Sequence, residues 1–279
     1  MDQIGGDSLT SIAVSAKNIL IVHAHPEPRS LNGSLKTLAA DTLQAAGHTV
    51  RISDLYAMQW QAAACGADFP QRDPAERLHY GRASRTAYDG GTQAPEVLAE
   101  QEKLLWADAL ILQFPLWWFA TPAILKGWID RVFANGFAYG IGVFDGKRYG
   151  SRYGEGKLLG KRALVSVTVG GQEAHYSARG VNGHIEDLLF PLTHGTLYYT
   201  GMAVLRPHVV FGANRLPDEQ YAAVAEAYTV RLRSLFSEPP IPFRAQNGGD
   251  YDEQLCLRAD LAQARSGPAI HQAAGDGGR

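Results

Sequence analysis

The segment PEVLAEQEKLLWADALILQFPLWWFATPAILKGWIDRVF, residues 95–133, decides the fold of this chain. Its first part predicts a helix over 95–107, because a proline suits a first helical turn and a glutamate beside it is favourable at the positive end of the helix dipole. The apolar run 108–114 predicts a buried strand, and the pattern from 121 onward predicts a second helix. A buried strand between two helices is typical of a parallel sheet covered by helices.

The same alternation continues on both sides of this segment. Short apolar or alternating runs predict further strands at residues 18–22, 50–52, 162–169 and 204–211, and helical patterns occupy 35–46, the region from about 183, and 217–236. We therefore expect an α/β fold, a flavodoxin-like doubly wound five-stranded parallel sheet of order 2-1-3-4-5 with helices on both faces. Residues 59–94, rich in Gly, Pro and Arg, are interpreted as an irregular surface excursion.

Composition excludes several classes of function. The 279 residues are 46% hydrophobic and 19% charged, which is typical of a globular protein. The net charge of −2 lacks the excess of positive charge that is typical of nucleic-acid-binding proteins. The two cysteines are too few and too far apart for a disulfide framework. No apolar run has the length of a membrane span, and the first residues do not form a signal peptide. We expect a soluble cytoplasmic protein without a nucleic-acid partner or membrane insertion.

The loop after the first strand, HAHPEPRSLNGS, lacks both the dinucleotide-binding and the P-loop glycine patterns. It places Ser30, Asn32 and Ser34 at a helix N-terminus, where hydroxyl, amide and backbone donors can hold a phosphate. Ordinary capping by Ser30 or Asn32 explains the same residues and is the favoured interpretation from the residue types alone. His23 and His25 lie two apart, but two imidazoles without further ligands do not make a metal site, so no metal is expected.

The loops after the third and fourth strands carry the chemistry. Residues 115–122, PLWWFATP, contain two tryptophans and a phenylalanine, whose large flat surfaces need either the protein's own core or a planar ligand such as an isoalloxazine. Gly170 and Gly171 would let backbone N–H groups approach the pyrimidine end of such a ligand, and Tyr176 could add a hydroxyl donor. A glycine turn and a packed tyrosine are the alternative reading.

At these residues the chain resembles the long-chain NAD(P)H quinone oxidoreductase family, the DT-diaphorase-like flavoproteins. The resemblance rests on VHAHPEPRSLNGS, SDLYAM, the whole of residues 95–133, GFAYG, SVTVGG, AHYSARGVNG and LTHGTLYYTG. It runs from about Lys17 to Pro242. It divides the chain into an N-terminal extension (1–16), expected to be flexible, a flavin-binding catalytic domain (17–242) and a C-terminal extension (243–279). The extension is expected to be partly disordered, above all in its last residues from 266.

The resemblance implies a homodimer that binds one FAD per subunit, with FMN the less favoured flavin. The implied flavin contacts are His25, Ser30, Leu31, Asn32, Leu116, Trp117, Trp118, Phe119, Thr168, Val169, Gly170, Gly171 and Tyr176. His79 and Tyr221 take the positions of family residues at the adenine end. The acceptor pocket implied is Trp118, Phe119, Gly170 and Gly171 from one subunit and Tyr139, Ile141 and Tyr199 from its partner.

The activity implied is two-electron reduction of quinones by a reduced nicotinamide, NAD(P)H or a truncated form, in ping-pong order. Tyr176, Asn182, Gly170 and Gly171 are the implied catalytic residues. Asn182 stands where one family branch has histidine, and Ile141 stands where that branch has tyrosine. Both changes occur in the branch that prefers truncated dihydronicotinamides. The stretch 140–160, rich in glycine and tyrosine, is longer than in typical members.

Two alternative functions remain open from the sequence. The same flavin and apolar pocket would serve a reductase of nitro or azo compounds. Relatives of this fold also act as ancillary subunits of ion-transport systems, so a flavin-binding regulatory subunit is the alternative from a different class.

Overall fold

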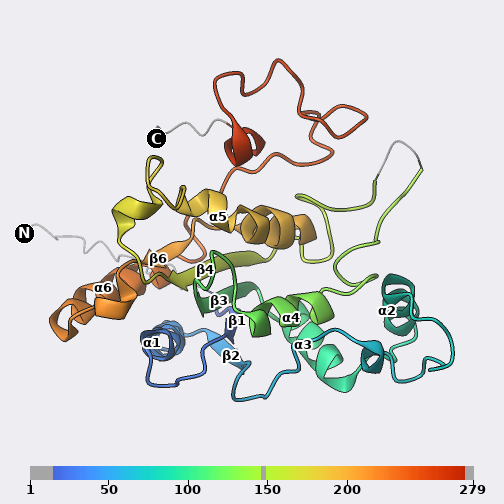
Figure 1. Ribbon diagram of the computed structural model, residues 1–279, viewed down its shortest axis with the longest axis horizontal. Coiled ribbons are helices and arrows are strands. Elements are labelled where there is room, and N and C mark those ends of the chain that lie inside the picture. Colours follow the sequence, from blue (N-terminus) through green and yellow to red (C-terminus); the bar gives the residue numbers. More distant parts are fainter. Residues whose placement is uncertain (1–14, 146–148, 274–279) are drawn as a thin grey trace, which may run out of the picture.

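A single parallel sheet forms the centre of the protein, as seen in the computed structural model, which describes residues 15–145 and 149–273 (Figure 1). The strand order is β2-β1-β3-β4-β5, with β6 also paired to β4, which confirms the predicted order. The strands are β1 (Asn18–His23), β2 (Thr49–Asp54), β3 (Ala109–Pro115), β4 (Arg162–Thr168), β5 (Ala203–Val204) and β6 (His208–Val210).

The fifth predicted strand is divided, so the sheet has six strands instead of five. Ala203 pairs with Arg162 at the start of β4, and His208 pairs with Ser166 nearer its end. Pro207 lies between the two pieces, and proline has no N–H to continue the ladder. The order of the sheet is unaffected, because both pieces run parallel to β4.

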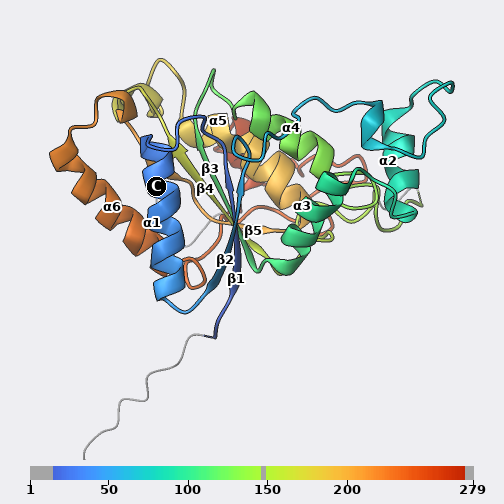
Figure 2. The same ribbon diagram turned by 90° about the horizontal axis from the view of Figure 1, so that it is seen from below.

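Helices cover both faces of the sheet. They are α1 (Leu31–Ala45), α2 (Tyr80–Asp89), α3 (Pro95–Trp106), α4 (Ala123–Val132), α5 (Ile185–Leu192) and α6 (Asp218–Arg233). Figure 2 shows the sheet nearly edge-on, with α1 and α6 on one side and α3, α4 and α5 on the other. Alternate residues of β1 serve the two cores, since Ile19 and Ile21 pack with α1 while Leu20 and Val22 pack toward the other layer.

Residues 59–94 lie largely at the surface, as interpreted, but they are more regular than expected. The segment contains α2 and a short 3-10 helix, and it carries Asp68, whose carboxylate lies 2.8 Å from the guanidinium of Arg131 in α4. Both side chains are 3% exposed, so this ion pair ties the segment to the core. Asp68 is one of three aspartates in this segment and gives no periodic signal, which is why the sequence pattern did not reveal its role.

The C-terminal extension folds back over α5 (Figure 1). Phe243 and Gln272 form an antiparallel bridge, and Gly267–His271 forms a 3-10 helix in contact with α5. The expected disorder therefore does not describe residues 266–273. Residues 1–14, 146–148 and 274–279 lie outside the described part of the chain. No helix within the described ranges has the length and apolarity needed to cross a membrane.

Candidate functional site

Three loops meet beyond the carboxyl ends of β1, β3 and β4, where open α/β sheets bind their ligands. The ring of His25, from the first loop, lies 6.2 Å from the ring of Trp117 in the second. Phe119 of the second loop lies 6.5 Å from Tyr176, which follows β4. Side chains singled out from the sequence in three separate segments thus share one edge of the sheet.

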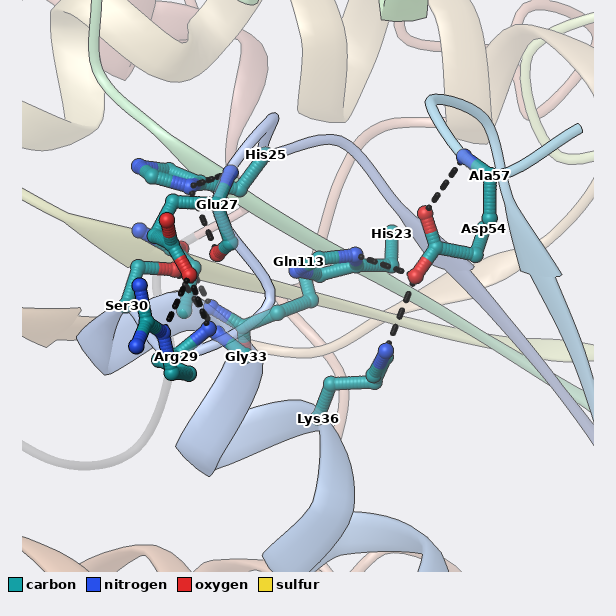
Figure 3. Close-up of polar contacts among 11 residues, drawn as sticks. His23, His25, Glu27, Arg29, Ser30, Gly33, Lys36, Asp54, Ala57 and Gln113 are labelled. Carbon is teal, nitrogen blue, oxygen red and sulfur yellow. Dashed lines mark hydrogen bonds and ion pairs between the residues drawn. The ribbon is translucent and has the colours of Figure 1, made fainter. Parts of the chain in front are cut away.

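The N-terminus of α1 is capped and leaves two donors open. The hydroxyl of Ser30 accepts from the N–H of Gly33 over 3.1 Å, which confirms the capping reading (Figure 3). A Cβ at Gly33 would lie 2.0 Å from the Pro28 carbonyl oxygen, so only glycine permits this close approach of the loop. The N–H groups of Leu31 and Asn32 have no acceptor among the described residues. They can donate to a phosphate at the positive end of the helix dipole.

A chain of buried polar side chains holds Asn32 in place. Its amide nitrogen Nδ2 donates to Oγ1 of Thr168 over 2.8 Å, and its Oδ1 accepts from Nε2 of Gln113 over 2.9 Å. The Tyr228 hydroxyl donates to Oε1 of Gln113 at 3.4 Å, and burial raises the pKa of Tyr228 to about 12. Asn32 is therefore fixed by partners on β3, β4 and α6 without any ligand present.

The aromatic loop after β3 is a strained two-residue turn. The backbones of Trp117 and Ala120 exchange two hydrogen bonds of 3.1 Å, which leaves Trp118 and Phe119 as the central residues. Their φ angles are +50° and +60°, left-handed values that bulky residues seldom adopt. Trp118 is 94% exposed and Phe119 is 46% exposed. Strain of about 1–3 kcal/mol at each residue, combined with bare aromatic surface, makes this turn a candidate ligand-binding site.

The loop after β4 brings two glycines against a buried tyrosine. A Cβ at Gly171 would lie 2.9 Å from Cε2 of Tyr176, and one at Gly170 would lie 2.6 Å from Nδ2 of Asn214. The N–H groups of both glycines have no acceptor within the described part of the chain. They can donate to a ligand beside Phe119, while the Tyr176 ring is held by packing 5.8 Å from Phe211.

Other predicted site residues lie elsewhere in the single chain. Tyr139 and Tyr199 line a cavity of about 470 Å³, and none of its lining residues comes from the three loops. Ile141 is not part of that lining. His79 and Tyr221 line two further cavities, and the one at Tyr221 also contains Ser34 from the first turn of α1.

Asn182 lies in the turn that follows Tyr176, and its side chain is half-buried. Its backbone N–H donates to the carbonyl of His175 over 3.0 Å. No side-chain hydrogen bond between Asn182 and Tyr176 occurs in the described residues. The structure thus keeps the two residues in one segment but shows no relay between them.

His23 lies beneath the first loop and belongs to an ionic group (Figure 3). Its Nδ1 is 3.2 Å from Oδ2 of Asp54, which also accepts from Nζ of Lys36 over 2.8 Å. Burial lowers the pKa of His23 to about 4 against the opposing effect of Asp54, so the imidazole is neutral at pH 7. No three His, Cys, Asp or Glu side chains come close enough to hold a metal within residues 15–145 and 149–273.

Gln113 and Tyr228 are site residues that the sequence analysis missed. A glutamine inside the otherwise apolar strand ALILQFP was the available signal, because a buried amide needs partners. Tyr228 gave no such signal, since a tyrosine on an amphipathic helix is most simply read as core.

An open parallel sheet with open N–H donors at a helix N-terminus and an exposed aromatic turn at the same edge is typical of a flavodoxin-like protein. Residues 17–232 match the family model described as flavodoxin-like fold, and the chain belongs to this family.

Individual relatives extend over most of the chain. A ribosyldihydronicotinamide dehydrogenase-like protein traD of Penicillium crustosum is 49% identical, with 84% of this chain and 86% of the relative covered. The human ribosyldihydronicotinamide dehydrogenase [quinone] is 42% identical, with 83% and 97% covered. The crystal structure of a Klebsiella pneumoniae protein assigned as a quinone reductase is 50% identical, has a TM-score of 0.90, and covers 92% of this chain and 100% of its own.

Proposed function

We propose that this protein is a flavin-dependent oxidoreductase that reduces quinones to hydroquinones with a reduced nicotinamide as donor. The observation that carries the proposal is the strained turn at Trp118 and Phe119, which presents bare aromatic surface beside the open donors of α1. The names of the human and Klebsiella relatives support the same activity.

The residues at the sheet edge fit a flavin. The N–H groups of Leu31 and Asn32 suit its phosphate, and the indole of Trp118 suits stacking on its ring system. Gly170 and Gly171 offer N–H groups for the pyrimidine end. The cavity at Tyr221 beside Ser34 gives room for an adenosine beyond the phosphate, so we propose FAD as the cofactor.

A bound flavin supplies hydride transfer from the nicotinamide to the quinone, in ping-pong order. The protein's own contribution is position and electrostatics. The Tyr176 hydroxyl and the glycine N–H groups stabilise negative charge at the cofactor. Phe119 and Trp118 exclude water from the face on which donor and acceptor bind in turn.

We propose that the active form is a homodimer, because one chain holds two separated halves of a site. The cavity lined by Tyr139 and Tyr199 contains no residue of the flavin loops, yet it is apolar enough to form a wall for a quinone. A second copy would place this wall opposite the exposed Trp118. The same contact would cover the apolar surface of the indole.

The donor is expected to be a truncated dihydronicotinamide in preference to NAD(P)H. Asn182 cannot accept a proton as histidine can, and no relay joins it to Tyr176. Both curated relatives described above carry ribosyldihydronicotinamide in their names.

An anaerobic visible spectrum of the purified protein tests the proposal. Addition of dihydronicotinamide riboside should bleach a flavin spectrum, and addition of menadione should restore it. A protein that binds no added FAD would refute the cofactor, and bleaching that menadione cannot reverse would refute the quinone. Bleaching reversed by a nitro or azo compound but not by any quinone would favour the alternative reductase.

A further inference from the structure

Tyr199, a wall of the proposed acceptor cavity, follows an irregular turn of helix. The helix α5 contains a proline, and the chain continues beyond it as a π-helical turn over Thr193–Leu197. Such wide turns are rare and are often found at functional sites. Thr196 and Tyr199 line the cavity of about 470 Å³, whereas His194 of the same turn does not.

His194 is instead enclosed by aromatic rings. The ring of Phe190 stacks on it at 4.5 Å with an interplanar angle of 11°, and that of Tyr153 at 4.8 Å with an angle of 25°. The C-terminal extension, which lies over α5 (Figure 1), adds Phe243 at 5.0 Å and His271 at 5.6 Å. The extension is therefore part of the packing that holds this turn in place. We call these five side chains the ring cluster.

Tyr153 joins the ring cluster to Tyr199. Its ring lies 5.0 Å from the ring of Tyr199 at an interplanar angle of 74°, and its backbone N–H donates to the Tyr199 carbonyl over 3.0 Å. Its own carbonyl accepts from the backbone N–H of Gln246, in the extension, over 3.1 Å. A single residue thus contacts the acceptor wall, the imidazole of His194 and the extension.

The backbone at Tyr153 is strained. Its φ angle is +49°, a left-handed value that an aromatic residue seldom adopts. At the next residue, Gly154, a Cβ would lie 2.6 Å from the hydroxyl oxygen of Tyr198, and this hydroxyl donates to the carbonyl of Phe243 over 3.1 Å. Strain of this kind persists only where the surrounding structure enforces it. The contacts with the extension contribute to that enforcement.

We propose that the C-terminal extension, acting through Tyr153, positions the Tyr199 wall against which a quinone binds. Tyr153 is a positioning residue, since it does not itself line the cavity. Loss of its ring should displace Tyr199, and a misplacement of about 1 Å at a bound substrate can cost about 100-fold in rate. The inference rests on the proposed quinone reductase, because it concerns the acceptor of that activity.

The reaction of the reduced, flavin-loaded protein with two acceptors tests the inference. Menadione takes two electrons and two protons and needs the cavity, whereas ferricyanide, a hydrophilic anion, takes one electron at a time from the exposed edge of a flavin. Stopped-flow mixing of dithionite-reduced protein with each acceptor gives the two rate constants for one sample. Tyr153→Leu should lower the menadione rate constant about tenfold and leave the ferricyanide rate constant unchanged.

Two further variants separate positioning from general stability. Tyr153→Phe keeps the ring and should restore the menadione rate constant. The matched control is Tyr56→Leu, the same loss of a ring at a half-buried tyrosine that follows β2, and it should change neither rate constant.

Equilibrium binding provides a measurement without turnover. Menadione titrated into the oxidised, flavin-loaded protein without donor should bind Tyr153→Leu about tenfold more weakly than the unmodified protein, measured by quenching of tryptophan fluorescence. Flavin affinity should be equal in the two proteins. Phe243→Leu acts from the extension and should weaken menadione binding about threefold, so it provides the test if Tyr153→Leu does not fold.

The possible failures are distinguishable. Unchanged menadione binding and an unchanged ratio of rate constants in these variants would overturn the positioning role and leave quinone reduction intact. An equal loss of both rate constants together with flavin affinity would show general damage and would also overturn it. An unmodified protein that neither binds nor reduces menadione would overturn the proposed function, and this inference with it.

Discussion

The side-chain amide of Asn32 donates to the hydroxyl of Thr168 over 2.8 Å, although 136 positions separate the two residues. The bond spans the central strand β3, where Gln113 holds the other end of the same amide. The first and third loops of the site are thereby fixed relative to each other before any ligand binds. Pre-organisation of this kind lowers the entropic cost of binding.

Thr168→Val tests this connection. The valine leaves the buried Asn32 amide without its acceptor, so we expect a loss of about 1–2 kcal/mol in the free energy of unfolding. Flavin affinity should fall about tenfold, because Asn32 also offers its N–H to the phosphate. Urea denaturation and flavin titration measure the two effects. Thr49→Val, at an exposed position, is the matched control and should change neither.

Trp118→Gly should separate stability from binding at the strained turn. Glycine relieves the left-handed backbone at φ +50°, so the flavin-free protein should gain about 0.5–1 kcal/mol in stability. Flavin affinity should fall at least tenfold because the stacking surface is lost. If the turn has the proposed role, thermal unfolding without flavin should show a higher stability of the variant. Equilibrium titration with FAD should show a lower affinity. An unchanged affinity would remove Trp118 from the cofactor site.

Tyr176→Phe removes only a hydroxyl from a ring that packs against Gly171. The ring contacts remain, so flavin should stay bound with unchanged affinity. We expect the rate of flavin reduction to fall about 100- to 1000-fold, which is the usual effect of removing one donor from developing charge. Stopped-flow absorbance measures this rate. Equal rates in the two proteins would contradict a role for the hydroxyl.

Asn182→His tests the expected donor preference. A histidine in the turn after Tyr176 could take up a proton, which asparagine cannot do. We expect kcat/KM for NADPH to rise while that for dihydronicotinamide riboside changes little. Steady-state assays with both donors measure the ratio of kcat/KM for NADPH to kcat/KM for dihydronicotinamide riboside. His184→Asn, in the same segment, is the control and should leave the ratio as it is.

Stability should fall on mild acidification because buried histidines are neutral in the folded state. Burial lowers the pKa of His23, His194 and His208 to about 4 from an ordinary 6.5. The unfolded chain takes up these protons as the pH falls below 6.5, and the folded chain does not, so stability is full above 6.5 and declines toward pH 4. Each histidine contributes up to about 3 kcal/mol across this window.

Urea midpoints at pH 7 and pH 5 measure this dependence. His208→Leu removes one of the three groups and should flatten the pH dependence by about a third. A midpoint that is the same at both pH values in the unmodified protein would show that these histidines titrate normally.

The sheet and its functional edge could be predicted from the sequence because they depend on local patterns. The strand before Trp117 is recognised by its continuous apolar run, and the helix after Ser30 by its capping residue and apolar periodicity. The division of the last strand at Pro207 was also available from the sequence, since proline interrupts a ladder.

The buried ionic and amide groups could not be predicted in the same way. Asp68 and Arg131 lie 63 positions apart, and each is an ordinary charged residue in its own segment. The link from Tyr228 to Gln113 spans 115 positions and joins α6 to the central strand β3. Such pairs are set by the packing of distant elements, which no local pattern encodes.

A newly made chain carries the indole of Trp118 in water until something covers it. Exposed aromatic surface promotes aggregation, and here it lies on a turn closed by two backbone hydrogen bonds. If flavin and a second copy are its natural cover, the yield of intact protein in a cell depends on the supply of riboflavin as well as on the intrinsic stability of the chain. Expression in vitamin-starved cells would then lose this protein to aggregates and proteases first.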